Sequence, residues 1–99
     1  MYYKMKNIFD NIDVICQIKS DGSAIPLKFR LQNEDGLFET YSIKTYKPVP
    51  KQGTRTTQDG IYVSNSTEIF ECRVVIFGME RTVRLYYSPK IDNRWKLAI

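Results

Sequence analysis

Hydrophobic and polar residues alternate most regularly over residues 69–87, where two apolar-rich runs meet at Gly78-Met79. This alternation predicts two strands that each bury one face. Because glycine adopts positive φ without steric cost, Gly78-Met79 predicts a type II′ hairpin turn. The inward pairs would be Val74–Val83, Cys72–Leu85 and Phe70–Tyr87. On the outer face, the same register would place Arg73 directly opposite Arg84.

A second hairpin is predicted over residues 12–31, with Asp21-Gly22 as a type I′ turn. Its inward pairs would be Ile18–Ile25, Cys16–Leu27, Val14–Phe29 and Ile12–Leu31, and its outward pairs Asp13–Arg30 and Ile15–Lys28. Pro26 has no N–H to donate, so we expect an edge or a bulge at its side of the strand.

A third turn is predicted at residues 33–36, where Gly36 suits the left-handed position of a three-residue loop with a G1 bulge. This loop would place Tyr41 opposite Phe29 and Ile43 opposite Leu27, with both on the core face. The third strand would then extend from about residue 37 to residue 46.

The rest of the chain is less regular. Residues 47–60 contain prolines and glycines without apolar periodicity and predict a long loop. A short strand is expected at residues 61–63, and a last strand at 94–99 with Trp95, Leu97 and Ile99 inward. Residues 1–11 have apolar positions near helical spacing, which leaves a short helix, a disordered arm or an added edge strand open.

These elements predict an all-β fold, a small antiparallel barrel or rolled sheet of five or six strands that is SH3-like or OB-like. We expect a single domain over residues 12–99, preceded by the arm or short helix of residues 1–11, because 99 residues provide too little chain for two cores. An open sheet packed by the N-terminal segment is the alternative fold.

Composition excludes several classes of protein. No apolar run approaches the roughly 20 residues that span a bilayer, and the N-terminus lacks the continuous apolar core of a signal peptide, so a cytoplasmic location is expected.

Histidine is absent, and Cys16 and Cys72 fall on predicted inward faces, so neither a metal nor another cofactor is expected. No nucleophile elbow or phosphate-binding loop occurs, and acidic residues mostly occupy predicted turns. We therefore expect no enzymatic activity.

Charge is distributed unevenly along the chain. Residues 1–72 hold nine basic and nine acidic side chains, whereas residues 73–99 hold six basic and two acidic ones. If the last strand pairs with the strand of residues 80–87, one outer face would combine basic side chains with an aromatic ring, as in barrels that bind single-stranded nucleic acid. The residues expected to bind it are Arg73, Arg84, Tyr86, Arg94 and Lys96, with Lys47, Lys51 and Arg55 from the long loop.

Two other interpretations remain open. The basic face can be a solvated surface that keeps the protein soluble, in which Glu71 offsets Arg84. Alternatively, the outward apolar residues Ile15, Val75 and Phe77 indicate a protein partner or a homodimer.

The runs Asp21–Arg30 and Arg94–Leu97, together with Cys72-Arg73, resemble small uncharacterised β-proteins of Firmicutes, and the likeness covers most of the chain thinly. Some proteins of that kind occur near translesion polymerase genes. The resemblance therefore implies a bacterial protein in a nucleic-acid context and supplies no active-site residues to transfer.

Overall fold

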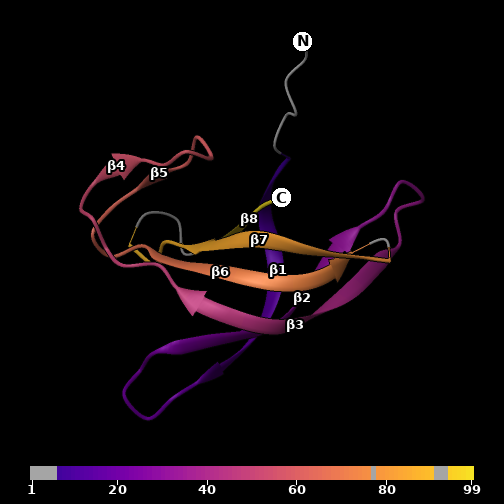
Figure 1. Cartoon of the computed structure of the whole chain (residues 1–99), viewed down its shortest axis with the longest axis horizontal. Coiled ribbons are helices and arrows are strands. Elements are labelled where there is room, and N and C mark those ends of the chain that lie inside the picture. The colour runs from indigo at the N-terminus through magenta and orange to yellow at the C-terminus, as the bar shows by residue number, and fades with distance from the viewer. Residues whose placement is uncertain (1–6, 77, 91–93) are drawn as a thin grey trace.

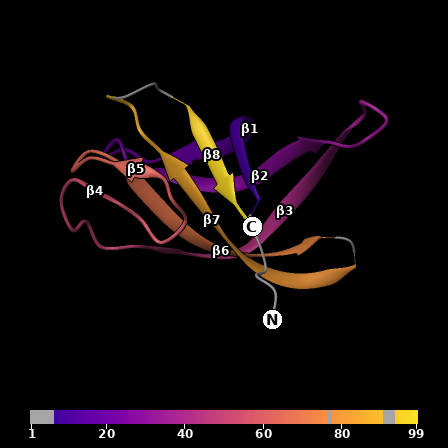
Figure 2. The same cartoon turned by 90° about the horizontal axis from the view of Figure 1, so that it is seen from above.

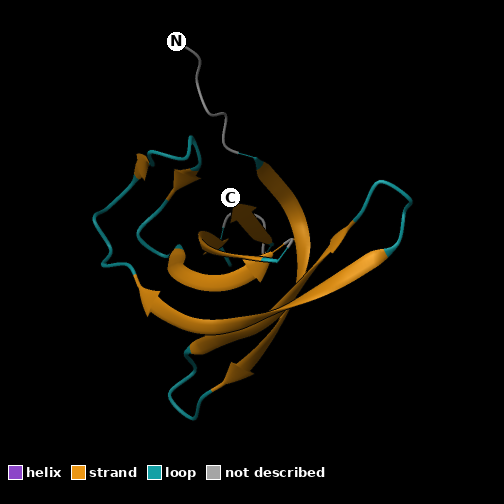
Figure 3. Cartoon of the chain, turned by 45° about the vertical axis from the view of Figure 1, so that its right-hand side comes forward, coloured by secondary structure: helices purple, strands orange, loops and turns teal. Residues whose placement is uncertain are grey.

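The structure, a computed structural model, describes residues 7–76, 78–90 and 94–99 (Figure 1). Six strands form a closed antiparallel barrel: β1 (Ile8–Ile18), β2 (Ala24–Gln32), β3 (Phe38–Pro48), β6 (Glu68–Ile76), β7 (Met79–Tyr87) and β8 (Trp95–Ala98). Two short strands, β4 (Arg55–Thr56) and β5 (Tyr62–Val63), form a separate hairpin. The described part contains no helix, as Figure 3 shows, and the predicted all-β barrel is confirmed.

The barrel is an up-and-down meander, in which each strand lies beside its neighbours in the order β1-β2-β3-β6-β7-β8. Closure depends on two long strands that change partner midway. β1 pairs with β8 through Ile8–Ile12 and with β2 through Asp13–Ile18, and β3 divides its pairing between β2 and β6 in the same way. Asn11 lies at the irregularity in the β1–β8 pairing with φ of 56°, a left-handed conformation that asparagine tolerates better than most residues.

Inward side chains from every barrel strand fill the interior. The buried members of this core are Phe29, Leu31, Phe70, Cys72, Val74, Ile76, Val83, Leu85 and Leu97. Six of these nine come from the two runs at 69–87, so the hairpin with the clearest sequence pattern also contributes most of the core.

The register predicted for the β6–β7 hairpin is wrong by two residues. Ile76 pairs with Met79, and Cys72 therefore lies opposite Val83 rather than Leu85. Gly78, with φ of 74°, is the second of the two residues between the strands, not the first. Because glycine suits either position and a shift of two preserves the alternation, the predicted inward faces stay correct while the pairing changes.

The β1–β2 hairpin is confirmed where it joins the barrel and differs near its turn. Val14–Phe29 and the outward pairs Asp13–Arg30 and Ile15–Lys28 form as predicted. Beyond them Cys16 pairs with Pro26, so that Leu27 is an extra residue whose side chain faces outward. This bulge beside Pro26 agrees with the expectation for that residue. The turn is longer than predicted: Lys19 N donates to Ser23 O, and Ile18 remains 65% exposed.

The turn between β2 and β3 is confirmed. Asn33 N donates to Leu37 O, Gly36 N donates to Asn33 O, and Gly36 has φ of 80°. Tyr41 lies opposite Phe29, with ring centroids 5.6 Å apart. Ile43 faces the interior, but its partner is Val74 on β6 rather than Leu27, since β3 has changed neighbour at that point.

The structure also shows the secondary structure of the two segments that the sequence left open, the N-terminal segment and the long loop. Residues 8–11 belong to β1, so the added strand is found there rather than a helix, and residues 1–6 lie outside the described residues. The long loop contains β4, which the sequence did not predict, and the predicted strand at 61–63 is β5. The last strand is confirmed as β8 and closes the barrel between β7 and β1, as Figure 2 shows.

Candidate functional site

The connection between β3 and β6 folds back over the outer face of β6 and β7, and the views of Figures 1 and 2 agree on this placement. A second, smaller core forms beneath it. Its buried members are Ile61, Val63, Ile69, Tyr86 and Ala98, with Val49 packed against them. Val49 N also donates to Ile69 O at 2.8 Å, which ties the start of the connection to β6. We call residues 49–67 the outer flap.

A buried polar network joins the outer flap to the barrel. Asp59, whose side chain is 1% exposed, accepts from Arg84 Nε at 2.7 Å and from its Nη2 at 3.0 Å. The Tyr86 hydroxyl donates to Asp59 Oδ2 at 2.5 Å and lies 3.0 Å from the Thr57 hydroxyl. The turn that presents Asp59 is closed by Gly60 N, which donates to Thr57 O. A bidentate carboxylate–guanidinium pair of this kind has fixed geometry as well as charge.

The network changes the protonation behaviour of two of its members. Burial raises the pKa of Tyr86, and the hydrogen bond to Asp59 raises it further. The hydrogen bond to Asp59 also raises the pKa of Arg84. Because both pKa values are raised, Tyr86 and Arg84 retain the protons that they donate in these hydrogen bonds.

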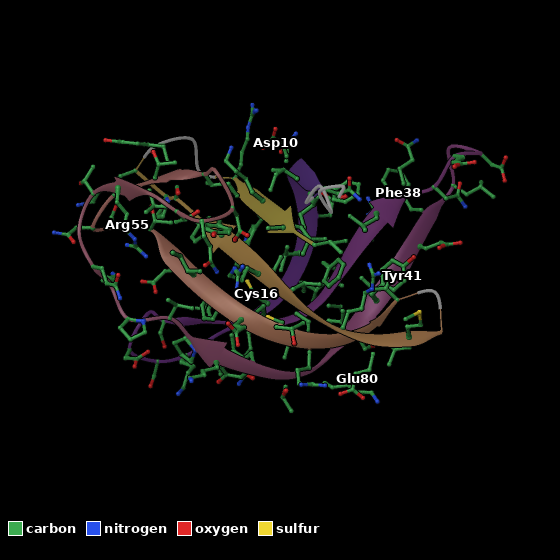
Figure 4. All side chains as sticks on the ribbon, turned by 45° about the horizontal axis from the view of Figure 1, so that its top comes forward. Asp10, Cys16, Phe38, Tyr41, Arg55 and Glu80 are labelled. Carbon is green, nitrogen blue, oxygen red and sulfur yellow. The ribbon has the colours of Figure 1, made fainter. Side chains whose placement is uncertain are left out.

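A polar cleft of about 320 Å³ lies between the outer flap and β6–β7. Arg84 forms part of its wall, and Arg55 lines it from β4, where Figure 4 labels it. In the amide orientation that satisfies both partners, Gln58 accepts from Arg84 Nη2 at 2.7 Å. Glu71 Oε2 lies 3.7 Å from Arg84 Nη1. Among the residues that the structure describes, Arg55 makes one long hydrogen bond, to Gly53 O at 3.4 Å, so its guanidinium has fewer partners than that of Arg84.

The predicted opposition of Arg73 and Arg84 does not occur. Arg73 lies opposite Thr82 and binds Glu80 with both Nε and Nη2 at 2.8 Å. That hydrogen bond lowers the pKa of Glu80, which Figure 4 labels. Because the hairpin register is shifted by two, Arg73 and Arg84 do not face each other, and each has a carboxylate partner.

Tyr86 faces outward as predicted but is 2% exposed, because the outer flap covers it. A nucleobase therefore cannot stack on its ring. Lys96 lies opposite Tyr86 and bonds to Asp10 at 3.3 Å. It lines a hollow at the other side of the outer flap with Tyr62, so the flap divides the predicted surface. Arg94 is exposed next to β8, away from the Arg55 cleft.

The basic residues of the long loop lie on the same side as the cleft. Lys47 is exposed on β3, opposite Glu71, and Glu71 lies opposite Arg84. Lys51 bonds to Glu68 at 3.2 Å. Of the basic residues predicted to bind nucleic acid, Arg55 and Arg84 line the cleft, and Lys47 lies on the other side of Glu71 from Arg84. Lys51, Arg73, Arg94 and Lys96 do not line it.

Of the residues predicted to contact a protein, Ile15 is 60% exposed on the β1–β2 hairpin and Val75 is 39% exposed on β6. Phe77 lies outside the described residues. Ile15 and Val75 come from strands that are not neighbours in the barrel.

Two residues important to this site were missed from the sequence. Asp59 is one of the acidic residues that fall in predicted turns, where turn chemistry explains an acid without any partner. At Tyr62 the sequence predicts only a short strand, and the structure places this ring on the outer flap with 58% exposure. A buried acid in a turn has no local signal, since its partner Arg84 is 25 residues away in the chain.

Within the described ranges, no group of three or more histidine, cysteine, aspartate or glutamate side chains is placed to hold a metal ion. The same residues include no helix long and apolar enough to cross a membrane. Cys16 and Cys72 are free thiols, and burial raises the pKa of Cys72 to about 12. Comparison of this chain with family models, curated proteins and solved structures finds no match.

Proposed function

We propose that this protein is a non-enzymatic binding module that holds single-stranded nucleic acid in the cleft between the outer flap and β6–β7. The observation that carries the proposal is the pair of guanidinium groups, Arg55 and Arg84, in the wall of one polar cleft. Arg84 is held rigidly by Asp59, whereas Arg55 has donors left for a phosphate oxygen.

Charge around the cleft supports the same ligand. The outer flap and the adjoining faces of β3, β6 and β7 carry six basic side chains against four acidic ones. The basic ones are Lys44, Lys47, Lys51, Arg55, Arg73 and Arg84, and the acidic ones are Asp59, Glu68, Glu71 and Glu80. The excess is small, so we expect modest affinity that weakens with added salt.

The ring available to a base is Tyr62. It pairs directly with Thr56 across the β4–β5 hairpin, so the two side chains lie on the same face of that hairpin. Thr56 lines the cleft, whereas Tyr62 lines the hollow at the other side of the outer flap, so a strand that leaves the cleft would cross the β4–β5 hairpin to reach its exposed ring. Stacking of one base on such a ring contributes about 1–3 kcal/mol.

The test is fluorescence anisotropy with labelled single-stranded DNA, RNA and duplex DNA at several salt concentrations. Since Arg84 also holds the outer flap, the informative double variant is Arg55→Ala/Lys47→Ala. If each side chain neutralises one phosphate, the slope of log affinity against log salt falls by about 1.4. Tyr62→Ala should weaken binding without changing that slope.

The matched control is Lys28→Ala/Lys90→Ala, which removes the same charge from residues outside the cleft. An equal loss of affinity in this control would mean that nucleic acid binds through the net charge of the protein and not through the cleft. Absence of binding to every probe at low salt would rule out the proposed function.

A further inference from the structure

The β1–β2 hairpin extends beyond the barrel, and Figures 1 and 3 both show its tip standing clear of the other strands. β8 covers one edge of β1 only as far as Ile12, which pairs with Trp95. From Val14 to Ile18, β1 pairs with β2 on its other edge. Among the described residues, no strand pairs with the second edge of Val14–Ile18.

This edge lacks the features by which proteins usually protect exposed strands. The extra residue of the bulge, Leu27, belongs to β2, so β1 itself remains regular. Residues 14–18 contain no proline and no charged side chain, and Ile15 and Ile18 are 60% and 65% exposed. Regular, apolar, uncharged edges are templates for pairing with another strand.

The sequence of this edge is complementary to itself. Two copies related by a two-fold axis through Cys16 would pair antiparallel, with residues whose numbers sum to 32 directly opposite each other. Val14 would then lie opposite Ile18 of the second copy. Just outside this pair, Asp13 would lie opposite Lys19 of the second copy, twice by symmetry. Opposite charges at facing positions stabilise strand pairing.

The two neighbouring registers do not offer the same match, since with the axis through Ile15 Asp13 would face the uncharged Gln17 of the second copy. With the axis through Gln17, Asp13 would face Asp21 of the second copy, and two carboxylates would oppose each other. In the present structure Asp13 bonds to Arg30 at 2.7 Å, yet its side chain stays 61% exposed and accessible to a second cation. We propose that the protein forms a symmetric homodimer through the Val14–Ile18 edge of β1, in the register centred on Cys16.

Sedimentation velocity over a range of concentrations tests this proposal with the full chain. We expect a monomer–dimer equilibrium that Lys19→Asp shifts to monomer by at least tenfold in the dissociation constant, because it places an aspartate opposite Asp13 at both symmetric positions. Lys19→Arg should retain the dimer. Lys90→Asp makes the same charge change in the connection after β7 and should also retain it.

Cys16 provides a second, independent measurement. Directly opposed residues of antiparallel strands have Cα atoms about 4.5–5.5 Å apart, which lies within the range that a disulfide spans. Mild oxidation with diamide, which accepts one hydrogen from each thiol, should therefore link Cys16 to Cys16. The covalent dimer should be absent in Cys16→Ser, and its yield should fall in Lys19→Asp.

A monomer at every concentration would overturn the proposal, and a strand of another protein would then be the partner to test for the Val14–Ile18 edge. A dimer that is insensitive to Lys19→Asp and gives no Cys16 link would also overturn it, since the interface would then lie elsewhere. Circular dichroism of each variant ensures that loss of the dimer is not loss of folding. The DNA titration proposed above uses neither Lys19 nor Cys16, so the two proposals can fail separately.

Discussion

At the residue scale, Asp59 has more influence on the structure than any other charged side chain of the outer flap. It is buried and accepts two hydrogen bonds from Arg84 and one from Tyr86. A buried charge is stable only when it is paired and hydrogen-bonded. Asp59 therefore fixes the position of the flap as well as the orientation of Arg84 in the cleft.

We predict that Asp59→Ala lowers the free energy of unfolding by about 2–3 kcal/mol, because Arg84 and the Tyr86 hydroxyl lose their partner in a largely buried place. Urea denaturation monitored by circular dichroism measures the loss. Glu68→Ala is the matched control, since it breaks an exposed pair with Lys51 and should cost less than about 1 kcal/mol. Equal losses in the two variants would show that the network contributes no more than a surface ion pair.

At the element scale, the β4–β5 hairpin is too short to be stable by itself, and tertiary packing maintains it. Its strands have two residues each, and it rests on the outer face through Ile61 and Val63. Two-stranded hairpins are at best marginally stable in water. The second core and the Asp59 network must therefore supply the stability that its own hydrogen bonds lack.

We predict that Ile61→Ala destabilises the outer flap by about 2–4 kcal/mol, through loss of burial and the cavity left behind. Amide hydrogen exchange should show faster exchange in the flap, with the barrel strands β6 and β7 less affected. Tyr62→Ala, at the exposed neighbouring position, should leave exchange unchanged. Uniformly faster exchange over the whole barrel in Ile61→Ala would mean that the flap and the barrel unfold as one unit.

At the scale of the whole molecule, the closed barrel makes its interior inaccessible to water. Cys72 is fully buried in that interior, and burial raises its pKa from 9.0 to about 12. The folded state therefore holds this proton more tightly than the unfolded state does. Stability that depends on the thiol is complete below pH 9 and is lost as the pH rises toward 12.

We predict that the free energy of unfolding falls as the pH rises above 9, with a slope that approaches about 1.4 kcal/mol per pH unit before the pH reaches 12. Urea denaturation at several pH values measures the slope. Cys72→Val keeps an apolar side chain of similar size and should flatten the curve over this range. If wild type and variant show the same slope, the loss of stability at alkaline pH comes from deprotonation of another group, such as Tyr86, whose pKa is also raised.

Local patterns predicted the strands and their inward faces well, because alternation depends only on which residues must be buried. The β2–β3 turn was predicted fully, since Gly36 allows one loop length that keeps Tyr41 inward. The β6–β7 register was not, because Gly78 fits either turn position and both registers bury the same residues. The wrong register also made the predicted site wrong, because Arg73 and Arg84 do not face each other and instead form separate ion pairs with Glu80 and Asp59.

The sequence by itself determined that this protein is all-β with Phe70, Cys72, Val74, Val83 and Leu85 inside, since burial on one face of a strand imposes a period of two. It left open whether the strands form a barrel, a rolled sheet or an open sheet, and the tertiary structure shows the closed barrel. The sequence also determined that basic side chains are concentrated in the last third of the chain. Only the tertiary structure decided which charges meet. Asp59 reaches Arg84 because the outer flap folds back over β6 and β7, and a contact between residues so far apart in sequence depends on the path of the whole chain.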